Sequence, residues 1–233
     1  MTSSVAKTLA IGSCAFVLLA LAEMAQAQTA SVAPRPVQLP PCDYDGQTVS
    51  VTLNTGTVLP VGLADPIWNV SPGFTAYSTT PATGWLANQA TAKWVQPASG
   101  GTPVDFYPTT LNYVYTAKFT TPSHPYYYNS IMITGTFAGD DSAVLTLNGA
   151  ATTNCPSTAN NSTSCFHVGK AFTIAGYQNF TQTGTAPFVN TLTIQVNNSN
   201  SIYSGLLVKA TLKAVCSKCT SPIPTCGGNP STC

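Results

Sequence analysis

The sequence predicts an all-β, antiparallel β-sandwich or jelly roll. Apolar and polar residues alternate with period two along several short segments, and none of these segments has a helical period. Abundant Gly and Pro between the segments supply turn chemistry. Because short strands follow one another without intervening helices, two facing antiparallel sheets are favoured over alternating βαβ units.

Strands are expected, in chain order, over Val49–Leu53, Val58–Leu63, Tyr113–Phe119, Ser130–Phe137, Ala143–Leu147, Asn190–Val196 and Leu206–Leu212. In the third of these, aromatic side chains alternate with Thr116 and Lys118. Successive side chains of a strand point to opposite faces, so one face of each strand is expected in the core and the other in water.

Composition divides the chain into four parts. Residues 1–27 combine a lysine, an apolar run and a small-residue cleavage pattern, which is typical of a secretory signal peptide. Residues 28–41 are Pro-rich and are expected to form an extended linker. The sandwich is expected over residues 42–215, and residues 216–233 form a tail with four cysteines. No later segment has the ~18 apolar residues of a membrane span, so we expect a periplasmic or extracellular protein without a transmembrane anchor.

Charge is scarce. Charged residues make up 6% of the chain, with a net charge of +1, whereas about 25% is usual in soluble domains. Lys and Arg do not cluster, and clustered basic residues are what neutralise phosphates. Nucleic acid is therefore not expected as a partner.

Two disulfides are expected in the sandwich. Cys155 and Cys165 flank a short polar loop that a local bridge would close. Cys42 precedes the first strand and Cys216 follows the last, and terminal strands in sandwiches often lie side by side. The sequence therefore predicts bridges between residues 155 and 165 and between residues 42 and 216.

The remaining cysteines lie at the two ends of the chain. Cys14 belongs to the expected signal peptide, which leaves seven cysteines in an oxidising compartment. Cys219 and Cys226 of the tail are expected to form disulfides rather than to bind zinc, although residues 216 and 219 have the spacing of a zinc knuckle. Because seven is odd, one cysteine is free, blocked or bonded to another molecule.

The middle of the chain carries a family resemblance. The residues that carry it are Tyr113–Phe119, Ile131–Phe137, Asp140-Asp141, Val144–Gly149, Asn190–Asn197 and Ser204–Leu206. This order of strands and corners resembles the galactose-binding-like jelly rolls, the sugar-binding modules of many bacterial glycosidases and surface proteins, over roughly residues 58–214. The resemblance implies a binding fold more often than a catalytic one, and a structural calcium.

Sugar binding needs flat aromatic faces and fixed polar groups. Trp68, Trp85 and Trp94, with Asp65, are candidates to supply both. The alternative for each tryptophan is packing in the core, above all for Trp68, while Trp85 lies in a long loop and is expected to be the most exposed. Tyr127, in a run of three tyrosines, is either part of a stacking platform or one ring of an alternating strand.

Asp140 and Asp141 stand at a corner between two expected strands. Their carboxylates either accept backbone N–H groups to fix the turn or hold calcium together with Asn148. As neighbours in extended chain they are expected to point to opposite faces, which does not suit a glycosidase pair.

Catalysis is not expected. After residue 27 the chain has no Glu, no Gly-x-Ser-x-Gly elbow, no His-Glu-x-x-His motif and no phosphate loop. The first function that we expect is a secreted, non-catalytic, lectin-like protein that binds carbohydrate or a cell-surface glycan. The alternative, favoured by low charge, Thr-rich faces and the odd cysteine count, is a self-associating structural protein of the cell surface or extracellular matrix, cross-linked by disulfides.

Overall fold

The structure is a computed structural model that describes residues 34–57, 60–71, 74–103, 112–121, 126–157, 163–181, 188–198 and 203–218. All of these belong to one compact unit. The expected signal peptide, and the tail cysteines Cys219 and Cys226, lie outside the described residues.

The all-β prediction is confirmed. The strands are β1 (Val37–Gln38), β2 (Thr48–Thr52), β3 (Ala64–Ser71), β4 (Phe74–Thr79), β5 (Trp94–Gln96), β6 (Asn112–Thr121), β7 (Tyr126–Gly139), β8 (Ser142–Leu147), β9 (Ala150–Cys155), β10 (Lys170–Ala175), β11 (Phe188–Asn197) and β12 (Leu206–Lys218). Two short helices, α2 (Cys165–Val168) and η2 (Tyr177–Asn179), flank β10.

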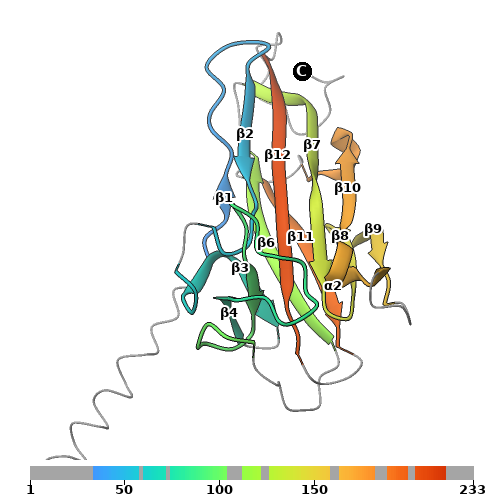
Figure 1. Ribbon diagram of the computed structural model, residues 1–233. Coiled ribbons are helices and arrows are strands. Elements are labelled where there is room, and N and C mark those ends of the chain that lie inside the picture. The colour runs from blue at the N-terminus through green and yellow to red at the C-terminus, as the bar shows by residue number, and fades with distance from the viewer. Residues whose placement is uncertain are drawn as a thin grey trace, which may run out of the picture. The chain divides into compact units, whose positions relative to one another are not determined.

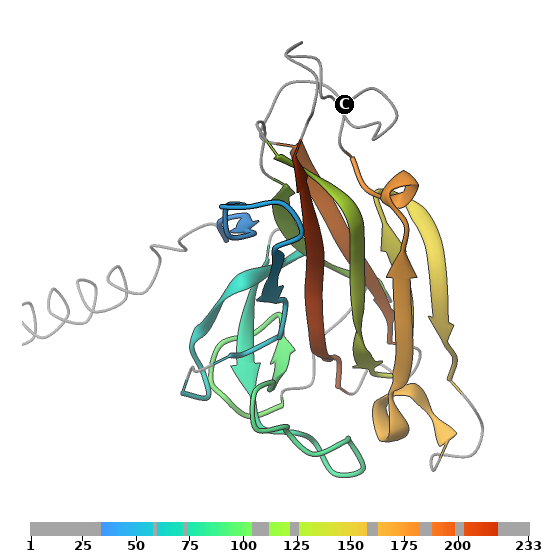
Figure 2. The ribbon, with the colours of Figure 1, turned by 90° about the horizontal axis from the view of Figure 1, so that it is seen from above.

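The strands form one antiparallel path that nearly closes on itself. Its order is β10-β7-β12-β5-β4-β3-β6-β11-β8-β9, with β2 added to β12 and the short β1 added in parallel to β6. Its two ends, β9 and β10, contact each other. Figure 1 shows β2, β12, β7 and β10 side by side, with β6 and β11 behind them. The order β12-β7-β10 can also be followed in Figure 2.

The core lies between the layer formed by β2, β12, β7 and β10 and the layer that contains β6, β8 and β11. Along β12, Leu206, Val208 and Leu212 are fully buried, while Lys209 and Lys213 are exposed. The other layer contributes aromatic and aliphatic side chains from β6, β8 and β11 to the same cluster. Each large apolar side chain buried in this way contributes roughly 1.5–3 kcal/mol. The predicted alternation of apolar and polar residues therefore buries one face of each of these strands in the core of the sandwich.

A second, smaller apolar cluster covers the outside of one end of β7 and β12. Its members are Trp85, Ala92, Trp94, Ala138 and Leu207. Ala138 and Leu207 follow core residues by one position, so their side chains point away from the main core. The segment that contains Trp85 and Trp94 packs over them and buries what would otherwise be an exposed patch.

One predicted strand and two predicted boundaries are wrong, one of them the end of the sandwich at residue 215, because β12 runs to Lys218. The strand expected over Val58–Leu63 is absent from its described part, residues 60–63, because Pro60 has no N–H and Gly62 turns the chain at a φ of 93°. The expected linker ends earlier than residue 41, since β1 pairs with β6 and Leu39 is buried. Extended, Pro-rich chain forms a short strand here, in which Leu39 is buried and Val37 packs against the core.

Both predicted disulfides are confirmed. Cys42 is bonded to Cys216 with a Cα–Cα distance of 5.9 Å, and Cys155 is bonded to Cys165 at 5.2 Å. The first bridge lies beside the β2–β12 pair, so the terminal strands do lie side by side. The second ties the end of β9 to the start of α2. Among the described helices, none has the length and apolar character of a membrane span.

Removal of the Cys42–Cys216 bridge should cost more stability than removal of the Cys155–Cys165 bridge. Their sequence separations are 174 and 10 residues, and by loop entropy the longer closure stabilises by about 5 kcal/mol and the shorter by about 3 kcal/mol. We expect paired Cys→Ala variants, compared by urea unfolding, to follow that order. Equal losses, or the reverse order, would contradict it.

Candidate functional site

The Asp140-Asp141 corner lies where β7 passes into β8, at the end of the sandwich where β11 ends and β12 begins. The backbone N–H of Asp140 donates to the carbonyl of Gly205 at 3.2 Å, and that of Asp141 donates to the carbonyl of Asn197 at 2.7 Å. The backbone N–H groups of both aspartates thus help to fix the corner. Both side chains are buried, with 8% and 4% of their surfaces exposed.

The two carboxyl groups face each other. Their side chains are hydrogen-bonded, and Trp85 Nε1 donates to Asp140 Oδ2 at 2.9 Å. The expectation that the two aspartates point to opposite faces is wrong, because it assumed an extended chain and the pair sits in a bend. Two acidic groups and one indole N–H therefore meet at a single point.

This arrangement changes the acidity of Asp140. Burial, and then the hydrogen bond and the negative charge of Asp141, raise the pKa of Asp140 to about 8, while the hydrogen bond from Trp85 opposes the rise. At neutral pH Asp140 is mainly protonated. The proton then lies in the hydrogen bond between the two carboxyl groups, and their remaining oxygens are acceptors.

Three aromatic side chains, those of Trp85, Trp94 and Tyr203, pack together beside the corner. The rings of Trp85 and Trp94 are 4.2 Å apart between centroids, with an angle of 32° between their planes. Tyr203 meets Trp85 edge-on, with centroids 6.5 Å apart, and 37% of its surface is exposed. Gly205 allows this packing, because a Cβ there would lie 2.6 Å from the Trp85 ring.

The expectation that Trp85 is the exposed tryptophan is therefore wrong. Only 8% of its surface is accessible, since it covers Gly205 and bonds to Asp140. Trp94 is fully buried, and its Nε1 donates to the carbonyl of Leu86 at 2.7 Å. The core alternative is correct for Trp94, and Tyr203 is the aromatic residue of the cluster that reaches the surface.

Hydrogen bonds join the segment that carries Trp85 to α2. Leu86 N donates to the carbonyl of Phe166 at 2.7 Å, and His167 Nδ1 lies 2.8 Å from the carbonyl of Gly84. α2 is itself tied to β9 through the Cys155–Cys165 bridge. The segment that carries Trp85 is thus anchored before and after the tryptophan.

Asp65 and Trp68, both candidates for ligand contact, are structural. The Asp65 carboxylate accepts the backbone N–H groups of Gly56, Ile67 and Trp68, the last at 2.7 Å. Burial raises its pKa, and these three hydrogen bonds oppose the rise. Trp68 is fully buried and its Nε1 donates to the carbonyl of Leu53 at 3.0 Å. The core alternative is therefore correct for Trp68, and the Asp65 carboxylate is turned inward to complete a turn.

The expected calcium ligands do not fit a calcium site. Asn148 lies at the other end of β8, about 20 Å along the strand from Asp141. Its Nδ2 donates to Asn190 Oδ1 and its Oδ1 accepts the N–H of Thr191, each at 2.9 Å. Calcium takes six to eight oxygens, and the described residues contain no group of three His, Cys, Asp or Glu side chains close enough to share a metal.

Tyr127 also lies away from the corner. It pairs with Ser217 near the other end of β7, and its side chain is outside the described part. Sequence reasoning did not single out Tyr203 as a site residue. A signal was available, because Tyr203-Ser-Gly205 directly precedes the strongest alternating strand, but the contact of Gly205 with Trp85 joins positions 120 residues apart and has no sequence pattern.

Comparisons with known proteins add little. No family model matches the chain, and no curated protein matches it. Among solved structures it is similar to the crystal structure of Ruminococcus gnavus beta-glucuronidase, with 11% sequence identity and a TM-score of 0.28. The match covers 68% of this chain and 30% of that one, so the chain spans less than a third of the enzyme. Such an overlap carries no argument about fold or function.

The free energy of unfolding should decrease between about pH 4 and about pH 8. Asp140 keeps its proton up to a pKa of about 8 in the folded protein, but loses it near pH 4 when unfolded. The folded state therefore holds more protons over this interval, and stability falls as pH rises. Asp65, whose pKa burial also raises, contributes with the same sign.

The variant Asp140→Asn keeps a neutral group and should flatten most of this decline, measured by urea unfolding at pH 5 and pH 8. One group contributes at most about 1.4 kcal/mol per pH unit. Identical slopes for wild type and Asp140→Asn would refute the assignment.

Proposed function

We propose that the protein is a secreted, non-catalytic, carbohydrate-binding β-sandwich of the galactose-binding-like kind. Its sugar site lies at the end of the sandwich that carries Tyr203, Trp85 and the Asp140-Asp141 pair. The observation that carries the proposal is the partly exposed ring of Tyr203. This ring contacts the Trp85 indole, and the indole donates a hydrogen bond to Asp140 of the buried carboxyl pair.

The chemistry of the corner suits sugar hydroxyls. Tyr203 offers an aromatic face for pyranose C–H groups. Near neutral pH the proton on Asp140 is used in the hydrogen bond between the two carboxyl groups, and their other oxygens can accept from a sugar hydroxyl, which both donates and accepts. The stacked tryptophans and the bonds from the Trp85 segment to α2 hold these groups before a ligand arrives, which lowers the entropy lost on binding.

The same geometry favours binding over hydrolysis. A glycosidase pair places its carboxyl groups about 5–10 Å apart on either side of the scissile bond. The carboxyl groups of Asp140 and Asp141 are hydrogen-bonded to each other, which leaves no room for a glycosidic bond between them. The proposal therefore includes no catalytic step and no metal.

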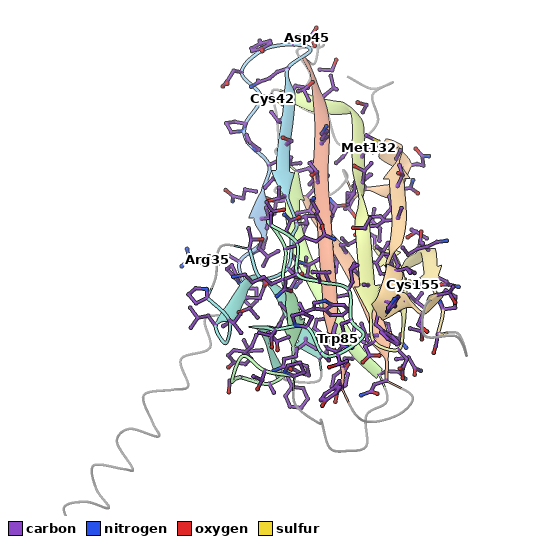
Figure 3. All side chains as sticks on the ribbon, in the orientation of Figure 1. Arg35, Cys42, Asp45, Trp85, Met132 and Cys155 are labelled. Carbon is purple, nitrogen blue, oxygen red and sulfur yellow. A yellow bond between two sulfur atoms is a disulfide. The ribbon has the colours of Figure 1, made fainter. Side chains whose placement is uncertain are left out.

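Tyr203→Ala should weaken binding of a glycan identified on an array by about tenfold, because it removes the exposed stacking ring, and 1.4 kcal/mol corresponds to a factor of ten. Tyr44 provides a matched control. It is 62% exposed and precedes Asp45, at the opposite end of the sandwich from Trp85 (Figure 3). Titration calorimetry should show wild-type affinity for Tyr44→Ala. The absence of any glycan ligand, or equal losses in both variants, would sink the proposal.

A second candidate is covalent self-association at the cell surface. The observation that favours it is that the two bridges of the sandwich use four of the eight cysteines. Cys14 lies in the expected signal peptide, which leaves Cys219, Cys226 and Cys233 for bonds outside the sandwich. Secreted material should then run as dimers or larger species on non-reducing gels and as monomers after reduction, and monomers under both conditions would exclude it.

A further inference from the structure

Four threonines stand in one row across four neighbouring strands. Thr173 of β10 pairs with Thr134 of β7, which pairs with Thr211 of β12, and Thr211 pairs with Thr52 of β2. Strands in a sheet are about 4.8 Å apart, so the row extends over about 14 Å. It crosses the layer that Figure 1 shows as β2, β12, β7 and β10.

All four side chains point away from the core. Thr52 and Thr173 are exposed, and Thr134 and Thr211 are partly exposed. Their chain neighbours, such as Ile133 and Leu212, are buried on the other side of the sheet. The flanking row holds Thr136 beside Lys209, and the row on the other side holds Ser50 beside Lys213. The outer face is therefore rich in hydroxyl groups, while Ala171 extends the Thr136 row, and Met132 and Ala175 extend the Lys213 row.

The charge of this face has one sign. Lys209 and Lys213 are exposed on either side of Thr211, about 13 Å apart along β12. The acidic residues of the described part lie elsewhere, in the interior or in the turn before β2 that holds Asp43 and Asp45. Within the same described part, neither lysine forms an ion pair. In a chain with so little charge, two unpaired cations on one face are a distinct feature.

We propose that this face, the outer surface of β2, β12, β7 and β10, is a second binding surface that takes an anionic, uronate-bearing polysaccharide. The threonine hydroxyls hydrogen-bond the hydroxyls of the chain, and Lys209 and Lys213 pair with its carboxylates. The proposal goes beyond the sugar site at the Asp140-Asp141 corner and does not depend on it.

Other partners match this face less well. Double-stranded nucleic acid carries a charge every ~1.7 Å, which two lysines about 13 Å apart cannot neutralise. A membrane surface needs an apolar face to insert, and this face is lined with hydroxyls. A second copy of the chain, stacked face to face, would bring like charges together. A polyuronate supplies both hydroxyl groups and carboxylates.

The opposite layer provides a matched control. There Asn69, Thr116, Thr193 and Thr146 also stand in register across β3, β6, β11 and β8. That face carries a single lysine, Lys118, on its strands. It has a similar row, of three threonines and Asn69, but lacks the pair of cations.

The test is affinity electrophoresis of the full secreted protein in native gels that contain polygalacturonate or neutral dextran, with EDTA present so that no divalent cation bridges the two polymers. We expect retardation by polygalacturonate and none by dextran. The double variant Lys209→Gln/Lys213→Gln should lose at least tenfold in apparent affinity, together with most of the salt dependence. The isosteric double variant Thr134→Val/Thr211→Val should lose several-fold.

Two control variants distinguish binding at the threonine face from binding at the Asp140-Asp141 corner. Lys118→Gln/Thr116→Val on the opposite face, and Tyr203→Ala at the corner, should both retain wild-type retardation. The proposal is overturned by wild-type protein that polygalacturonate does not retard. It is equally overturned if Lys118→Gln/Thr116→Val or Tyr203→Ala weakens retardation as much as the Lys209→Gln/Lys213→Gln pair does. Failure of Tyr203→Ala to affect array binding bears on the sugar site alone.

Discussion

The pairing of β7 with β12 is the constraint on which the rest of the structure depends. The register runs from Gly139 opposite Leu206 to Tyr126 opposite Lys218, with one irregularity between Val215 and Cys216. Because side chains alternate, this one register sends Phe137 and Val208 into the core and Thr134 and Thr211 to solvent. A slip of one residue would exchange the two faces.

The same register builds the candidate sugar site. It brings the end of β7 to the start of β12, so that Gly205 lies beside Asp140. The absence of a side chain at Gly205 admits the Trp85 ring, and Trp85 in turn bonds to Asp140. The high pKa of Asp140 is therefore a result of packing, since the indole and the strand ends exclude the water that would otherwise solvate its charge.

The sequence predicted those parts of the fold that depend on local alternation. The strand that became β12 was visible because Leu206, Val208 and Leu212 alternate with Lys209 and Thr211. The Cys42–Cys216 bridge followed from cysteine positions next to the terminal strands, and the Cys155–Cys165 bridge followed from the short polar loop between its two cysteines. β5 was missed because its three residues are all buried and show no alternation.

The candidate site was harder to predict because it is made of contacts between distant residues. The neighbouring aspartates were noticed, yet their shared orientation depends on a bend, and the exposure of each tryptophan depends on what packs over it. Trp85 looked like a loop residue by its surroundings in the chain. Its burial follows from Gly205 and Leu207, which lie about 120 positions away. Such a contact leaves no period in the sequence.

The Cys42–Cys216 bridge and the candidate sugar site lie at opposite ends of β12. The bridge lies near the end of β12 where the described chain stops at Lys218, whereas Tyr203 and Gly205 precede the start of the same strand. The thirteen residues of β12 are equivalent to about 40 Å of extended chain. If the segment after residue 218 is bonded to a neighbouring molecule, the length of β12 separates that attachment point from the Asp140-Asp141 corner. The threonine face then lies on the side of the molecule, between the attachment point and the corner.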